Sequence, residues 1–99
     1  MAEPTEEYRT GTHATVTKVA ASITPVVLTD YDVLSTCVSV FNDSVHPLYL
    51  KFGAGATDDD FTVKINAGGY YESPFPQYRG IITGVWPVAS GCARVTEVT

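Results

Sequence analysis

Two five-residue runs constrain the fold of this chain more than any other feature. Residues 48–52 (LYLKF) and 61–65 (FTVKI) each alternate apolar and polar side chains, and a loop of Gly, Ala, Thr and Asp residues joins them. Side chains of a β-strand point alternately to opposite faces, so the pattern predicts two strands that share one core. The side chains expected to face that core are Leu48, Leu50, Phe52, Phe61, Val63 and Ile65.

The rest of the sequence has strand patterns and no helical one. From residue 12 onward apolar residues do not recur at helical spacing, whereas turn formers recur about every ten residues. We predict an all-β fold over residues 13–99, a small antiparallel β-sandwich or jelly-roll-like barrel of about seven to eight strands. Residues 1–12 are expected to be an extended N-terminal arm, which either docks on a neighbouring chain or is a frayed terminus. The other expected strands are residues 13–20, 24–29, 34–41, 70–73, 79–86 and 92–98.

Two of these strands carry more specific predictions. Residues 79–86 have apolar side chains on both faces, which is typical of a central strand covered on both sides. Residues 34–41 alternate, so one set of side chains should face the core and the other should face away. The inward set is Leu34, Thr36, Val38 and Val40, and the outward set is Ser35, Cys37, Ser39 and Phe41.

Composition and charge exclude several classes of function. The chain has 99 residues, which suits one domain, and a formal net charge of -5. Its six Lys and Arg residues are scattered, so the sequence does not predict nucleic-acid binding. No run reaches the length of a membrane span, and the acidic N-terminus lacks the features of a signal peptide. We therefore expect a protein made in a cytoplasm, with no membrane partner.

The two cysteines, Cys37 and Cys92, do not form a metal or redox motif. They are far apart in the sequence and no other cysteine is present. In a reducing compartment two free thiols are expected. A disulfide between two neighbouring strands is the alternative.

The sequence lacks the residues of a catalytic site. His13 and His46 are the only histidines, and no strained serine turn or third group accompanies His46. The segment 53–57 (GAGAT) is rich in glycine, but the Lys and Ser or Thr of a phosphate-binding loop do not follow it. We predict no enzyme activity, no cofactor and no small-molecule substrate.

Three consecutive aspartates, Asp58, Asp59 and Asp60, stand in the loop between the first two runs. In an extended chain adjacent side chains point to opposite faces, and the spacing of an EF-hand loop is absent. We expect a solvent-facing loop tip, with a calcium site as the alternative. The charges also discourage edge-to-edge pairing with another sheet.

Aromatic residues concentrate late in the chain, where they predict a contact surface. One short strand cannot bury the aromatic area of 70–78 (YYESPFPQY), and aromatic residues are enriched at the centres of interfaces. Core packing is the alternative for these rings, and stacking on a sugar beside Glu72 and Gln77 is another. The expected interface residues are Tyr8, Arg9, Tyr70, Tyr71, Phe75, Tyr78 and Trp86.

Several of these motifs resemble a pattern in small structural proteins of tailed bacteriophages. The motifs are VFNDS, LYLKFGAGATDDDFTVKINAGGYYE, GIITGVW and SGCARVTEV, and the resemblance covers residues 38–99. It implies a virion protein of the capsid-decoration or cement type, commonly a homotrimer, which binds the major capsid protein at capsomer junctions on the capsid surface. A receptor- or glycan-binding module of a phage tail or fibre is the alternative.

Overall fold

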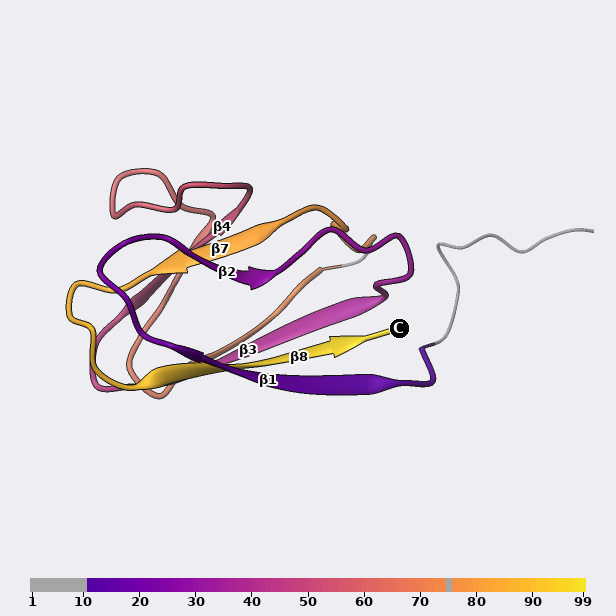
Figure 1. Cartoon of the computed structure of the whole chain (residues 1–99), viewed down its shortest axis with the longest axis horizontal. Helices are drawn as coiled ribbons and strands as arrows, with labels where there is room; N and C mark the ends of the chain where they lie inside the picture. Colours follow the sequence, from indigo (N-terminus) through magenta and orange to yellow (C-terminus); the bar gives the residue numbers. More distant parts are fainter. Residues whose placement is uncertain (1–10, 75) are drawn as a thin grey trace, which may run out of the picture.

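Eight β-strands and their loops form the part of the chain that the computed structural model describes, residues 11–74 and 76–99 (Figure 1). The strands are antiparallel and form two sheets of four, which confirms the predicted β-sandwich. Sheet A has the order β1-β8-β3-β6, and sheet B has the order β2-β7-β4-β5. The strands are β1 (Ala14–Ala20), β2 (Val26–Thr29), β3 (Cys37–Asp43), β4 (Leu48–Phe52), β5 (Val63–Ile65), β6 (Tyr70–Glu72), β7 (Ile82–Val85) and β8 (Cys92–Val98).

The chain passes from one sheet to the other at nearly every connection between these strands. Only β4 and β5 are consecutive in the chain and lie in the same sheet. Their register pairs Leu48 with Ile65 and Leu50 with Val63, as the two alternating runs predict. In Figure 1, β2, β4 and β7 of sheet B lie above β1, β3 and β8 of sheet A. Within the described chain no helix is long and apolar enough to cross a membrane.

The core lies between the inner faces of the two sheets. Val38 and Val40 are buried, as the alternation of residues 34–41 predicts, and Leu48 and Leu50 face them from sheet B. Burying side chains of this size stabilises the fold by about 2 kcal/mol each. The buried core cluster consists of Leu28, Val38, Val40, Leu48, Leu50, Ile65, Ile82, Trp86, Ala93 and Val95.

Two side chains expected in the core are exposed, so those predictions are wrong. Phe61 is 39% exposed because β5 begins only at Val63, and residue 61 belongs to a loop on the outer side of sheet B. Its ring lies 5.1 Å from that of Tyr49, centroid to centroid. Leu34 is 50% exposed, and Ser35, which was expected to face outward, is only 2% exposed, because both precede β3, which begins at Cys37. In each case the alternating pattern of the sequence extends beyond the end of the strand.

Strand β7 is buried on both faces, as its sequence predicts. Its inner face meets sheet A, and the segment 53–60 covers part of its outer face. Oγ1 of Thr83 donates a 2.7 Å hydrogen bond to the carbonyl of Gly53 and accepts one of 3.2 Å from the N–H of Ala56. Ala56 is fully buried as a result. A loop therefore covers a face that a two-layer sandwich would otherwise leave open.

Both cysteines are free thiols, as expected. Strands β3 and β8 are neighbours, but their register pairs Cys37 with Val98 and Cys92 with Asp43. The two cysteines therefore lie at opposite ends of the ladder, about 20 Å apart at the rise of a β-strand. The register excludes a disulfide between them.

Candidate functional site

Two rows of side chains cross the face of sheet A that points away from sheet B. In the first row the strand register places Tyr70, Phe41, Arg94 and Lys18 side by side. The second row contains Glu72, Ser39, Thr96 and Val16. We call these eight residues the A face.

The A face exposes apolar area that the fold does not cover. Val16 is 64% exposed, Tyr70 63% and Phe41 37%. Arg94 and Lys18 continue the row of the two aromatic rings across β8 and β1. Aromatic residues and arginine are the types enriched at interface centres, so the A face has the composition of a contact surface.

The turn before β6 fixes the position of Tyr70. Gly68 has a φ of 70°, a backbone conformation that glycine adopts without strain. The N–H of Gly68 donates to the carbonyl of Asn42 at 3.0 Å, and the N–H of Asn42 donates to the carbonyl of Gly69 at 2.9 Å. These bonds attach the turn to the end of β3. Tyr70 consequently enters sheet A directly beside Phe41.

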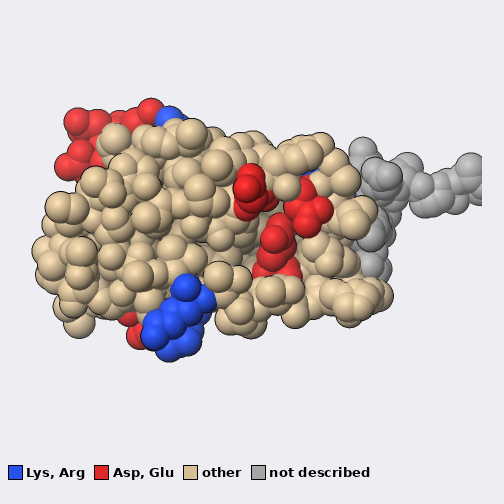
Figure 2. All heavy atoms as spheres, in the orientation of Figure 1, with Lys and Arg blue, Asp and Glu red and all other residues tan. Residues whose placement is uncertain are grey.

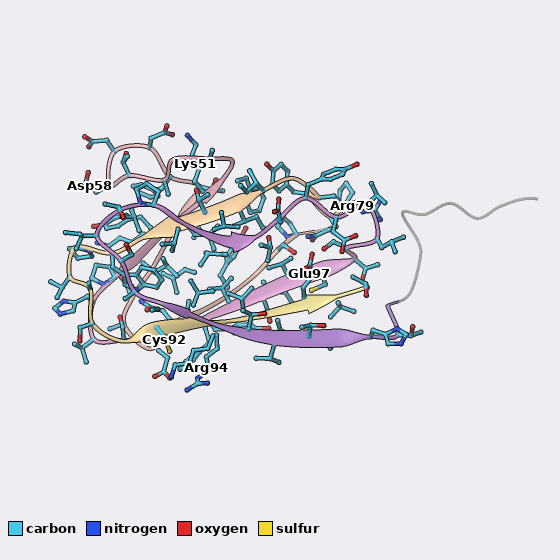
Figure 3. All side chains as sticks on the ribbon, in the orientation of Figure 1. Lys51, Asp58, Arg79, Cys92, Arg94 and Glu97 are labelled. Atoms are coloured by element: carbon cyan, nitrogen blue, oxygen red, sulfur yellow. The ribbon has the colours of Figure 1, made fainter. Side chains whose placement is uncertain are left out.

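An ion pair holds one of the two cations in the first row, Arg94. Nε of Arg94 lies 3.0 Å from Oδ2 of Asp43, and both side chains are about half exposed. Such a pair contributes less than about 1 kcal/mol to stability, so its effect is mainly to orient the guanidinium. Figure 2 shows a basic group at the lower edge of the molecule, where Figure 3 labels Arg94.

Next to the A face, the Cys37 thiol faces a carboxylate. Its Sγ donates a 3.5 Å hydrogen bond to Oε2 of Glu72. Burial, followed by the hydrogen bond and the negative charge of Glu72, raises the pKa of the Cys37 thiol. This environment favours the neutral thiol, which is a poor nucleophile.

The structure separates the predicted contact residues into different environments. Tyr70 is exposed on the A face, whereas Tyr71 points inward and packs against the core. Tyr78 also packs against the core, where its ring stacks on Phe52 at 4.7 Å and its hydroxyl donates to the carbonyl of Ile81. Tyr8, Arg9 and Phe75 lie outside the described residues.

Trp86, another predicted contact residue, is a core residue of the described fold. It is 1% exposed, and its Nε1 donates a 3.1 Å hydrogen bond to Oδ1 of Asn42 on the opposite sheet. The Trp86 ring therefore packs in the core and is not part of a contact surface. Phe41 and Val16 on the A face were not among the predicted contact residues. The alternation of residues 34–41 had placed Phe41 on the outward side, and that was the signal that could have found it.

The two polar residues considered for a sugar site point in different directions. Glu72 lies on the A face and accepts the hydrogen bond from Cys37. The amide of Gln77 is bonded to the side chains of Ser73 and Ser35 and to the carbonyl of Tyr78. These bonds occupy the Gln77 amide, so it does not join Glu72 in a binding site.

A pocket of about 300 Å³ lies on the opposite side of the molecule, where segment 53–60 meets sheet B. Val85 and Tyr49 come from the outer face of this sheet, and Thr57 and Asp58 provide polar atoms from the loop. Its volume is at the lower limit for small-molecule sites. The full lining consists of Ile23, Pro25, Tyr49, Ala56, Thr57, Asp58, Val85, Trp86 and Pro87.

The three aspartates beside this pocket are all exposed, as expected for a loop tip. Asp60 forms an ion pair of 2.6 Å with Lys51, and Oγ1 of Thr57 accepts hydrogen bonds from the N–H groups of Asp59 and Asp60. Figure 3 labels Asp58 on this loop and Lys51, which belongs to β4, beside it. In the described part of the chain no three His, Cys, Asp or Glu side chains are grouped in a way that could hold a metal ion.

Comparison of the chain with protein-family models, with curated proteins and with solved structures gives no match.

Proposed function

We propose that the protein is a non-enzymatic structural protein of a tailed-phage virion, which binds the major capsid protein through the A face. The resemblance of residues 38–99 to small phage structural proteins supports the virion and the capsid as its location. The A face supports the mode of binding. A capsid-decoration protein of this kind stabilises the shell at capsomer junctions as a homo-oligomer.

One observation carries the proposal, the row formed by Tyr70, Phe41, Arg94 and Lys18. Two exposed rings and two cations lie on adjacent strands of one sheet. The strands hold these side chains before any partner arrives, so binding costs little conformational entropy. Contacts of this kind suit attachment to another folded protein.

We also propose that the sandwich is a jelly roll. In support, the sheet orders β1-β8-β3-β6 and β2-β7-β4-β5 place the first strand beside the last and the second beside the seventh. Eight-stranded jelly rolls occur in viral capsid proteins and in lectins. This is an analogy between folds, and it favours the capsid proposal and the alternative below equally.

A binding assay with empty capsids tests the main proposal. On this proposal a phage encodes the chain, and expanded empty shells of that phage are mixed with purified protein and sedimented. We expect wild-type protein to sediment with the shells and the double variant Phe41→Ser, Tyr70→Ser to stay in the supernatant. Truncating two central aromatic contacts typically costs several kcal/mol of binding free energy.

Tyr31→Ser is the matched control, because Tyr31 is 65% exposed but lies in the turn after β2. This variant should bind the shells as wild type does. Fluorescence of Trp86 verifies that each variant is folded. Normal sedimentation of the folded double variant would refute the proposal.

The second candidate is a glycan-binding module, and the pocket beside segment 53–60 favours it. Tyr49 provides an aromatic wall, and Asp58 and Thr57 provide hydrogen-bonding atoms at the opening. A tyrosine beside a carboxylate is a combination that can bind a sugar ring. If this alternative is correct, Tyr49→Ala should abolish binding to immobilised host glycans while Tyr70→Ser has no effect.

A further inference from the structure

The four edge strands of the described sandwich differ in how well they resist pairing with another chain. Strands β5 and β6 have three residues each, and β2 has four with a register shift between Val27 and Thr29. Short or irregular edges present few consecutive backbone groups. Strand β1 has seven residues in unbroken register with β8, from Ala14 opposite Val98 to Ala20 opposite Cys92.

Strand β1 also lacks the residues that usually protect an edge. It contains no proline and no glycine, and its one charged residue is Lys18. All of its side chains are exposed except that of Val19, which is partly buried. A long, regular and exposed edge is a template for the addition of a further strand.

The hydrogen bonds at the ends of β1 identify the backbone groups that face away from β8. The N–H of Thr99 donates to the carbonyl of His13, and the N–H of Ala21 donates to the carbonyl of Gly91. In an antiparallel ladder every second residue bonds to the same neighbour, so Thr15, Thr17 and Val19 also bond to β8. The even-numbered residues between them direct their N–H and C=O groups toward the free edge.

We propose that β1 pairs antiparallel with β1 of a second copy of this chain, so that two A sheets become one continuous eight-stranded sheet. The register centred on Thr17 pairs all seven residues and forms up to about eight backbone hydrogen bonds. It places Thr17 opposite Thr17 of the second copy, a favourable cross-strand pair. Val16 then lies opposite Lys18, and no like charges face each other directly.

The chemistry of β1 favours a second copy over an unrelated extended segment. The strand is complementary to itself in this register, because each side chain meets a small, apolar or hydroxyl partner or the stem of Lys18. A two-fold axis through Thr17 uses the same edge on both copies, and the remaining described edges are short. The assembly is therefore a closed dimer and not the trimer that the resemblance implies.

Opposite charges at residue 17 provide the sharpest test. Thr17 is exposed in the single copy, so Thr17→Lys and Thr17→Glu should each fold. Wild type should sediment at twice the chain mass of 10.6 kDa. Each charged variant should raise the dimer dissociation constant by at least about tenfold, because like charges meet at the axis. An equimolar mixture of the two variants should restore dimers, because a lysine of one copy then faces a glutamate of the other.

Two further variants complete the test. Thr15→Lys places the same charge on the same strand but opposite Val19, so it should remain dimeric. Val16→Pro removes an N–H from the free edge and none from the ladder with β8, so it should fold as a monomer. Wild type that is monomeric at about 0.1 mM protein, or an oligomer that these variants leave unchanged, would overturn the inference.

The pairing does not depend on the capsid role. A folded A-face variant that still binds shells would refute the proposed function and leave the dimer intact. A trimer insensitive to Val16→Pro would refute the pairing and leave the capsid role intact.

Discussion

Trp86 donates a hydrogen bond of 3.1 Å from its indole Nε1 to Oδ1 of Asn42, and both side chains are buried. Nδ2 of Asn42 donates to the carbonyls of His46 and Ile65 at 2.8 and 3.0 Å. One side chain of sheet A thereby holds residues at the ends of β7 and β5 and in the turn before β4. In the described residues no buried side-chain nitrogen or oxygen lacks a partner.

Replacing Asn42 should therefore be among the most damaging single changes to stability. In Asn42→Ala the Trp86 N–H loses its partner inside the core and the carbonyls of His46 and Ile65 each lose one donor, which should lower the free energy of unfolding by about 3 kcal/mol or more. Urea denaturation followed by Trp86 fluorescence measures the loss. Asn66→Ala is the control, because Asn66 is exposed and contributes only its backbone carbonyl to the network. Equal stability of the two variants would contradict the role of Asn42.

The hydroxyl of Thr83 should control whether segment 53–60 stays on sheet B. Thr83→Val keeps the shape of the side chain but removes its bonds to Gly53 and Ala56. We expect a loss of about 1 to 2 kcal/mol in the free energy of unfolding, with faster hydrogen exchange at the N–H of Ala56. Thr96→Val, at a partly exposed site on the A face, should change neither. Unaltered exchange at Ala56 in Thr83→Val would show that other contacts hold the loop.

Gly91 and Gly55 allow the effect of a steric clash to be separated from that of backbone strain. Both have positive φ, 90° and 75°. A Cβ at residue 91 would lie 2.5 Å from Cβ of Ser44 and 2.7 Å from the carbonyl oxygen of Asp43, whereas one at residue 55 meets nothing within 4 Å. Gly55→Ala should cost about 1 kcal/mol, the strain alone, and Gly91→Ala clearly more. Thermal unfolding of both variants is the measurement, and a smaller cost at residue 91 would refute the clash.

The raised pKa of Cys37 should make stability depend on alkaline pH. Between the unfolded and the folded pKa, the unfolded chain has released the thiol proton and the folded chain retains it. Stability is therefore fully present at lower pH and is lost as pH rises through the folded pKa. Wild type should lose free energy of unfolding with rising pH more steeply than Cys37→Ser, as urea denaturation on both sides of the thiol pKa would show.

Glu72→Gln provides the companion measurement for Cys37. Removing the negative charge should bring the thiol pKa back toward its ordinary value and speed alkylation of Cys37 by iodoacetamide. Parallel pH profiles of wild type and Cys37→Ser would contradict the raised pKa of the thiol. Diverging profiles with unchanged alkylation in Glu72→Gln would show that burial alone raises it.

The sequence by itself determined the β class, the hairpin of β4 and β5 and the inward side of most strands. These properties depend on the alternation of apolar and polar side chains with a period of two residues. That alternation is local, so it can be seen in short segments such as 38–41 and 48–50. The same periodicity already placed Phe41 outward.

The tertiary structure decided which strands are neighbours, and with that the position of every surface. The register of β3 with β8 separated Cys37 from Cys92, and the packing of Trp86 onto Asn42 turned an expected contact residue into a core residue. The start of β5 at Val63 left Phe61 outside, and the order of sheet A left β1 at an edge. Each of these depends on contacts between residues far apart in the chain, about which the alternation within a single strand carries no information.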